Sequence, residues 1–435
     1  MSSQSHASTA RPTLQKIFSQ HRRTFEQEHG AGLSPQQWLA LRKITACRTP
    51  VLGGNEHVCA DCGCTHELYH SCNHRLCPQC GANEAHEWCE QKSADLLPGV
   101  DYFMVTPTLP GSLRAECRRS ERQWYDWFFA ATSNALMDML ADNKDGLGGQ
   151  AGFFGVLQTW RRDLDYHPHI HYIVPGGVLI EERHKEPGQR KKSLHRRWKP
   201  CLTGSKGPYL VNAIALQTAV RKRMEQLVKE QAPALYARIP RNVWRQSWRI
   251  DIRHVGSGKE VTRYLARYVT KSAIANNQLQ DCNNERVTHS YTPGGQKRSR
   301  RKTLPAHQFM KRVLQHALPE GFKRIRYFGW LHPSAKNRLE HVKLLVGKPL
   351  VYEQKSPAKE SAPNKIKLQC KQCKGDRFEP PTKIAPLSTT RRTLWELTTF
   401  GAPPPPPKLT SISIRKNGSR APPTNPAQAT KVKAS

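Results

Sequence analysis

Acidic residues are scarce in this sequence. It holds 34 Asp and Glu against 69 Lys and Arg, a formal net charge of +35 over 435 residues. Residues 351–435 contribute 16 basic and 5 acidic side chains, a net +11, which leaves +24 on the first 350 residues. Positive charge spread over folded sequence indicates a nucleic-acid partner, because contacts with phosphates dominate such affinities. An anionic membrane surface or a ribosomal position is the alternative on charge alone.

Long apolar runs are also missing. No segment approaches the ~20 apolar residues that span a bilayer, and residues 1–11 are polar, unlike a secretory signal. These absences predict a cytoplasmic, nucleoid-associated protein with no membrane partner. In that compartment cysteines predict metal sites rather than disulfides, and eight of the thirteen lie between Cys47 and Cys89.

Two cysteine pairs in this segment have the spacing of metal ligands. Cys59 and Cys62 are followed, after fourteen residues, by Cys77 and Cys80, a pattern close to that of a zinc ribbon. We expect these four thiolates to hold one structural Zn²⁺. Four further residues lie close by in sequence: Cys47, His57, Cys72 and His74. They could bind a second ion, or they could be ordinary buried cysteines and surface histidines. A late pair, Cys370 and Cys373, is a half-site without obvious partners.

Helices and strands alternate irregularly along the chain, which predicts an α+β fold on a mainly antiparallel sheet with flanking helices. Residues 1–95 are expected to form a helical and zinc-binding domain, with a helix capped by Ser34 and Gln37. Residues 96–350 are expected to form the α+β domain, and the Pro- and Lys-rich residues 351–435 a largely disordered tail. The expected strands are 100–106, 153–160, 166–174, 248–254, 285–292 and 321–330, and the expected helices are 118–140, 210–230 and 305–318.

The basic segments 183–199 and 297–302 are either solvated loops or contacts for a DNA backbone, with Lys297 and Arg298 as candidates. We expect the first of them to be a mobile loop.

Three histidines alternate within the expected strand 166–174. His167, His169 and His171 therefore point to one face, whereas Ile170 points to the other. Neutral imidazoles suit divalent metals of intermediate softness, so the pattern predicts a metal site, with Mg²⁺ or Mn²⁺ as the ion and a preference for Mn²⁺ in vitro. Pro168 weakens the strand and makes His167 the least certain ligand. A polar, solvent-facing strand is the alternative.

Two tyrosines share the face of an expected helix that begins after Ser257. Tyr264 and Tyr268 lie one turn apart on an apolar stripe, and Lys271 follows within reach. Such tyrosines usually pack in a core. Beside a metal-polarised phosphate and the cations Arg263 and Arg267, they could instead act as nucleophiles.

Taken together, these residues resemble the rolling-circle insertion-sequence transposases, the two-tyrosine branch of the His-hydrophobic-His endonuclease superfamily, with an N-terminal zinc-binding domain. The resemblance covers about residues 47–333. It is carried by Ser71–Cys80, Thr106–Pro110, Tyr166–Gly177, Val255–Gly258, Tyr264–Tyr268 and Tyr327–Pro333.

The resemblance implies a nuclease domain in which His169 and His171 hold the metal and Tyr264 and Tyr268 are the nucleophiles. It also implies single-stranded DNA as substrate, with the hairpin-forming ends of a mobile element as the expected partner, and 5′-phosphotyrosine intermediates. A replication initiator with the same chemistry, or a zinc-dependent DNA-binding regulator without catalysis, is the competing interpretation.

Overall fold

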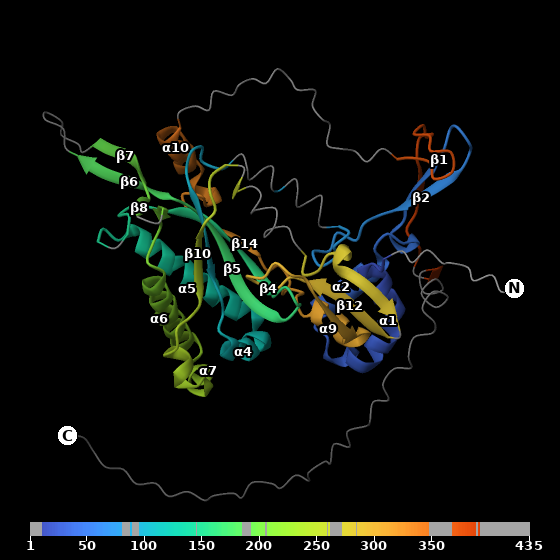
Figure 1. Cartoon of the computed structure of the whole chain (residues 1–435), viewed down its shortest axis with the longest axis horizontal. Helices are drawn as coiled ribbons and strands as arrows, with labels where there is room; N and C mark the ends of the chain where they lie inside the picture. The colour runs from blue at the N-terminus through green and yellow to red at the C-terminus, as the bar shows by residue number, and fades with distance from the viewer. Residues whose placement is uncertain are drawn as a thin grey trace, which may run out of the picture.

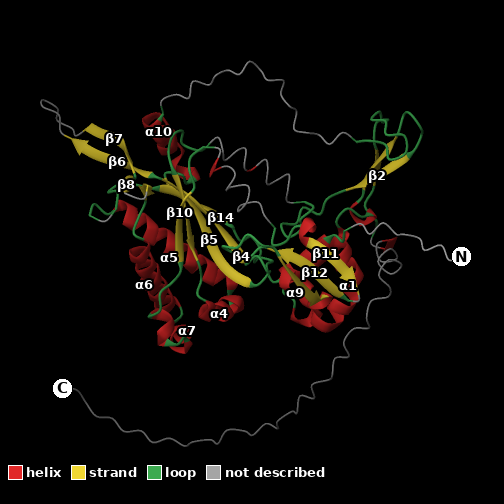
Figure 2. Ribbon diagram, viewed as in Figure 1, coloured by secondary structure: helices red, strands yellow, loops and turns green. Residues whose placement is uncertain are grey.

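The computed structural model describes residues 11–80, 88, 95–144, 146–184, 193–204, 207–258, 260–261, 272–283, 285–347, 368–388 and 390–391. Within these residues the chain forms three units, which we name the sheet body, the helical body and the cysteine arm (Figures 1 and 2). The fold is α+β with antiparallel sheets, as the sequence predicted. No helix in the described part of the chain is long and apolar enough to cross a membrane.

The sheet body is built on five antiparallel strands in the order β10-β3-β5-β4-β14. Their bounds are β3 Tyr102–Pro107, β4 Gly152–Trp160, β5 Tyr166–Pro175, β10 Ile250–His254 and β14 Ile325–Gly329. One face packs against α5 (Glu121–Ala141) and α6 (Ala213–Gln231), and this core includes Phe128, Tyr172 and Val220. The opposite face carries a second cluster that includes Met104, Phe154 and Val342 of α10 (Lys336–Val346). Short helices α4 (Arg114–Arg119) and α7 (Pro233–Arg238) complete the unit.

The helical body joins segments that are far apart in sequence. It contains α1 (Leu14–His29), α2 (Pro35–Ala46), the three-stranded sheet of β11 (Leu279–Asn283), β12 (Arg286–Tyr291) and β13 (Arg300–Pro305), and α9 (Ala306–Leu314). One core holds Phe18, Leu41, Val287 and Phe309 together. Packing therefore crosses the boundary that we predicted at residue 95. Both hydrogen bonds of the predicted capping box between Ser34 and Gln37 are present.

The cysteine arm is a small antiparallel sheet made by β1 (Gly54–Val58), β2 (Thr65–Tyr69) and β15 (Thr382–Ile384). Strand β15 comes from the segment that we expected to belong to a disordered tail. Within that segment, residues 382–384 pair with β1, and Phe378 pairs with Cys59. Residues 351–367 and 392–435 lie outside the described part of the chain.

A long hairpin replaces the mobile loop that we expected at residues 183–199. Strands β6 (Gly177–His184) and β7 (Ser193–Pro200) pair over their whole length, and residues 185–192 between them are outside the described residues. Glu181 pairs with Arg196 at 2.7 Å, and Trp198 packs edge-on against Trp330. Cross-strand pairing thus neutralises part of the basic charge. A second hairpin joins β8 (Leu202–Gly204) to β9 (Gly207–Tyr209).

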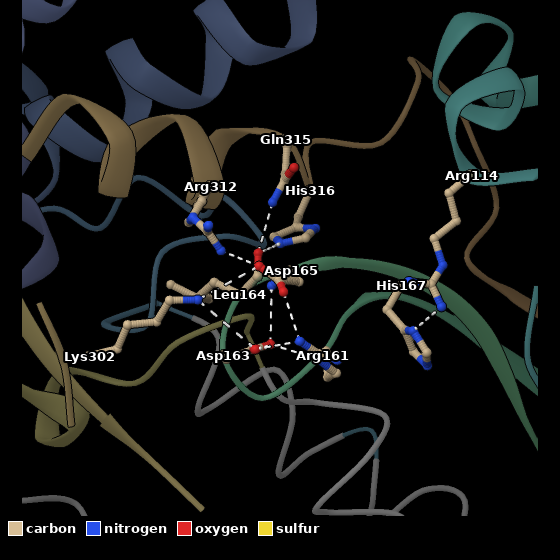
Figure 3. Close-up of polar contacts among 10 residues, drawn as sticks. All are labelled: Arg114, Arg161, Asp163, Leu164, Asp165, His167, Lys302, Arg312, Gln315 and His316. Carbon is tan, nitrogen blue, oxygen red and sulfur yellow. Dashed lines mark hydrogen bonds and ion pairs between the residues drawn. The ribbon is translucent and has the colours of Figure 1, made fainter. Parts of the chain in front are cut away.

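The turn between β4 and β5, residues 161–165, connects the sheet body to the helical body (Figure 3). Asp165 pairs with Arg161 and with Arg312 of α9, and Lys302 of β13 lies 3.8 Å from the same carboxylate. The carbonyl of Leu164, a residue with a φ of +68°, accepts hydrogen bonds from Gln315 at 2.8 Å and from His316 at 3.3 Å. We call these contacts the turn clamp.

His316 is the buried member of the turn clamp. A carbonyl can only accept, so Nε2 of His316 carries the proton toward Leu164, and Nδ1 accepts from the Thr159 hydroxyl at 3.1 Å. Burial lowers the pKa of this imidazole from 6.5 to about 3. The unfolded chain therefore takes up the proton first as the pH falls.

We predict that His316 makes the fold sensitive to acid. Its contribution should be complete above pH ~6.5 and lost progressively as the pH falls toward about 3, because only the unfolded state gains a proton in that range. Replacing His316 with Gln should lower the free energy of unfolding at neutral pH by about 1–3 kcal/mol. The same change should make the free energy of unfolding, measured in denaturant titrations, depend less steeply on pH. His70→Gln, at an exposed position, is the control and should leave the free energy of unfolding nearly unchanged; an equal slope in all three proteins would contradict the prediction.

Candidate active site and cysteine groups

The three histidines of β5 lie in the centre of the sheet. Because β5 is flanked by β3 and β4, His169 is opposite Gln158 on one side and Thr108 on the other. Alternation sends Ile170 and Tyr172 into the core beneath α5, so the histidines face the other side of the sheet. The predicted common face is thus confirmed by the strand pairing.

His169 and His171, the two predicted metal ligands, each have a partner for Nδ1. Nδ1 of His169 donates to the carbonyl of His167 at 2.7 Å, which leaves the lone pair of Nε2 for a ligand. Nδ1 of His171 lies 3.2 Å from the hydroxyl of Thr106. The two rings are nearly perpendicular, with centroids 4.7 Å apart. Imidazole nitrogens are ligands that divalent ions of intermediate softness accept, and in both rings Nδ1 has a partner that orients the side chain.

Burial keeps both imidazoles neutral. It lowers the pKa of His169 from 6.5 to about 4, and it lowers the pKa of His171 well below its ordinary value. A neutral ring is the form that binds a metal. Both side chains are therefore in the ligating state at physiological pH without any proton being removed first.

His167 is held differently. Nη2 of Arg114 lies 2.6 Å from Nδ1 of His167, and because a guanidinium can only donate, that nitrogen must accept. Burial, assisted by His169 and three nearby arginines, lowers the pKa of His167 to about 3, so Nε2 of the neutral ring carries the proton. In this arrangement neither nitrogen has a free lone pair. Within the described residues the three histidines do not form a group with all ligand atoms inside 4.8 Å. The structure therefore does not support His167 as the third metal ligand.

The predicted tyrosine helix begins on the histidine side of the sheet. The Glu260 side chain accepts from the backbone of Ser257 at 3.3 Å, which is one half of the expected capping box. Val261 is fully buried in the cluster that contains Met104 and Phe154. Beyond it the expected nucleophiles and cations lie outside the described residues: Arg263, Tyr264, Arg267, Tyr268 and Lys271. Their roles stay predictions.

Four cysteines meet in the core of the helical body. Cys47 follows α2 directly, and its sulfur lies 3.4 Å from Cys80 and 3.6 Å from Cys77, while Cys72 and Cys80 are 3.5 Å apart. A tetrahedral zinc site with Zn–S bonds of ~2.3 Å requires sulfurs about 3.8 Å apart, whereas a disulfide requires about 2 Å. Hydrogen bonds from Cys72 and Cys77 lower the pKa of Cys47, which favours a thiolate. We call this set the first cysteine group.

A second cysteine group closes the cysteine arm. Cys59 lies 3.6 Å from Cys373, and Cys62 lies 3.5 Å from Cys370, although these partners are more than 300 residues apart in sequence. The late pair is held in place by its own turn, where Cys370 donates to the carbonyl of Gly375. Nε2 of His66 lies 3.3 Å from the sulfur of Cys370.

The predicted grouping of the cysteines is therefore wrong. Cys59 and Cys62 do not meet Cys77 and Cys80, because each pair has another partner pair. Of the extra candidates, Cys47 and Cys72 complete the first group. His57 and His74 belong to neither group: His57 packs against Phe378, and His74 accepts from the backbone of Leu76.

The number of cysteines held a clue to this arrangement. Three Cys-x-x-Cys pairs and the single residues Cys47 and Cys72 supply the eight ligands of two tetrahedral sites, so the late pair did not have to stand alone. Which pairs combine depends on the tertiary fold and cannot be read from spacing.

Lys297 and Arg298, which we proposed as DNA contacts, lie at the exposed turn between β12 and β13 in the helical body. Neither approaches the histidine strand in any contact that the structure records. Their role in DNA binding stays a prediction.

Comparisons with known proteins agree on one family. Residues 152–338 match a family described as "Putative transposase", of the two-tyrosine type, and residues 17–109 match a "Transposase zinc-binding domain" of the IS91 type. The chain is 30% identical to the "Putative transposase y4qJ" of Sinorhizobium fredii over 74% of its own length and 80% of that protein. It is 27% identical to the "Transposase for insertion sequence element IS801" of Pseudomonas savastanoi pv. phaseolicola, over 75% of its own length and 78% of that protein. No solved structure matches it.

We predict two zinc ions per chain. Cys373→Ser should remove one ion, and Cys77→Ser should remove the other and lower the melting temperature more, because the first group lies within a hydrophobic core. Elemental analysis by mass spectrometry and thermal unfolding would measure both effects. Cys64→Ser is the matched control, since Cys64 lies in the same arm but in neither group. A single zinc in the parent protein, or zinc loss with the control, would contradict the assignment.

Proposed function

Because the chain belongs to the IS91-type family of two-tyrosine transposases with an N-terminal zinc-binding domain, we propose that it cuts and rejoins single-stranded DNA through 5′-phosphotyrosine intermediates. The reaction would take place at a divalent metal held by His169 and His171, and it would mobilise an insertion sequence by a rolling-circle-like route.

The observation that supports this proposal best is the pair of neutral, oriented imidazoles on the side of the sheet where the tyrosine helix begins. Mg²⁺ or Mn²⁺ bound there would polarise a phosphoryl oxygen and offset the charge that develops during displacement. Gln158 is directly opposite His169 on β4, is almost fully buried and lies on the same side of the sheet, and an amide oxygen is a ligand that Mg²⁺ and Mn²⁺ accept. We assign the position of the third ligand to Gln158 in place of His167.

The chemistry follows from the tyrosine pair. The phenolic oxygen of Tyr264 or Tyr268 attacks the phosphorus, the bond from phosphorus to the 3′ oxygen breaks, and the departing strand takes up a proton to become a free 3′ hydroxyl. The energy of the phosphodiester is retained in the tyrosine ester, so a 3′ hydroxyl can reverse the step without ATP. Lys271 and the arginines of the same helix would stabilise the phenolate. Two tyrosines allow two strands to be held in turn, as strand exchange demands.

The two zinc sites are assigned a structural role. Zinc in the first cysteine group would fix the helical body, and zinc in the second would fix the cysteine arm, so that both can help to grip the hairpin-forming ends of the element. A replication initiator would use the same chemistry, but the similarity to transposases over three quarters of the chain favours transposition.

We predict a covalent protein–DNA adduct. Purified protein, incubated with Mn²⁺ and a labelled single strand that carries the element's own end, should give a protease-sensitive band of reduced mobility on a denaturing gel. The band should vanish with EDTA, with His169→Ala and with the double change Tyr264→Phe and Tyr268→Phe. Each single tyrosine variant shows whether one residue can act alone.

Tight binding of the strand without any adduct, at every metal and end sequence tried, would favour a zinc-dependent DNA-binding regulator. An adduct that survives the double tyrosine change would show that another residue is the nucleophile.

We also predict that Thr106 tunes the metal site. Its hydroxyl contacts Nδ1 of His171, and partners of this kind typically change metal affinity by about 10–100-fold. Thr106→Val should therefore raise the Mn²⁺ concentration needed for half-maximal adduct formation by about tenfold, with little change at saturation. Thr108→Val, on the same face but opposite His169, serves as the control. Equal metal dependence in both variants would refute the role of Thr106.

A further inference from the structure

Arg114 reaches the end of the histidine strand from outside the sheet. After β3 the chain runs beside the start of β5, where the backbone N–H of Leu109 donates to the carbonyl of Pro168. It then enters α4 at Arg114. The guanidinium donates to His167 through Nη2, while Nε is buried and has no hydrogen-bond partner. Figure 3 shows this pair apart from the turn clamp. A guanidinium with a neutral partner and a spare buried N–H can accept an anionic ligand.

Arg249 lies beside the edge strand β10, which is separated from the histidine strand β5 only by β3. It precedes β10, its carbonyl accepts from the backbone of Thr108, and Thr108 is opposite His169. Antiparallel partners share a face, so the side chains of Arg249, Thr108 and His169 point to the same side. Arg249 is exposed.

The nearby carboxylates are occupied by other cations. Asp163 pairs with Arg161, and Asp165 pairs with Arg161 and Arg312. Asp251, two residues after Arg249, pairs with Arg253 at 2.5 Å. Among the described residues no carboxylate pairs with Arg114 or Arg249. Two arginines of this kind beside a metal site leave local positive charge that a phosphate would neutralise.

We infer that Arg114 and Arg249 bind a phosphate of the DNA strand adjacent to the one at His169 and His171, and that His167 orients Arg114 for this contact. The inference rests on the proposed function, since it takes the reacting strand to lie across the histidine face. Arginine suits this task because its planar guanidinium matches two phosphate oxygens at once. His167, which donates no lone pair to a metal in this arrangement, thereby gains a positioning role.

The test measures DNA binding without catalysis. In EDTA, with zinc content checked, Arg114→Gln and Arg249→Gln should each weaken binding of a labelled single strand carrying the element's end by about tenfold. Each should also make the dependence of log affinity on log salt shallower by about 0.7, the value for one lost phosphate contact on a single strand. Arg114→Lys should keep most of the salt dependence, because it keeps the charge.

The matched controls are Arg119→Gln on the same helix α4, where Arg119 is exposed and paired with Glu116, and Arg238→Gln on α7. These changes remove equal charge elsewhere and should leave the affinity nearly unchanged. If the control variants bound the strand as weakly as the test variants, only the total charge of the protein would matter, and the inference would be overturned.

The phosphate itself can be located with single methylphosphonate linkages, which remove one negative charge each. One such linkage beside the cleavage position should weaken binding to the parent protein. The same linkage should cause no further loss of affinity in the Arg114→Gln variant. Additive losses at every linkage, or unchanged affinity in both arginine variants, would overturn the inference. Because binding is read in EDTA, an absent tyrosine adduct would refute the proposed function without deciding this result.

Discussion

Strand β5 lies between β3 and β4, and its register against them decides which side chains reach the open side of the sheet. His169 is opposite Gln158 on β4 and Thr108 after β3. Two residues further along β5, His171 lies beside Thr106. A slip of one residue would send the histidines into the core and expose Ile170 and Tyr172. The apolar packing of Tyr172 under α5 opposes that slip, so the hydrophobic core on one side fixes the positions of His169 and His171, the proposed metal ligands, on the other.

The turn clamp extends this control to the helical body. The same short turn that starts β5 is bound by Arg312, Gln315 and His316 from α9 and the residues after it. The packing of α9 against α1 continues the connection to the N-terminal helices. The first cysteine group lies in that core, so the position of the histidine strand depends on a metal-stabilised unit that contributes no ligand to it.

Much of this arrangement follows from local pattern. Alternating histidines in an apolar strand, the cap at Ser34 and the strand pair around the 161–165 turn could be predicted because each depends on neighbours in sequence. The cysteine groups could not, since three pairs and two single cysteines combine in several ways and only the tertiary fold selects one. The role of His167 depended on Arg114, a residue 53 positions away that no motif marks. The β6–β7 hairpin was hidden because its basic composition suggested a loop, although Glu181 and Arg196 pair across it.

The second cysteine group also sets an order of events during synthesis. Cys62 and Cys370 are separated by 308 residues, which a ribosome adds in about 15–60 s at roughly 5–20 residues per second. Throughout that interval the first half of the site has two thiols and no partners, and β1 lacks β15 along one edge. The arm is therefore completed only after the whole sheet body has been made. A chain that stops before residue 370 would carry the histidine strand and the proposed tyrosines and still lack a finished arm, so the second cysteine group distinguishes chains that extend past residue 373 from shorter ones.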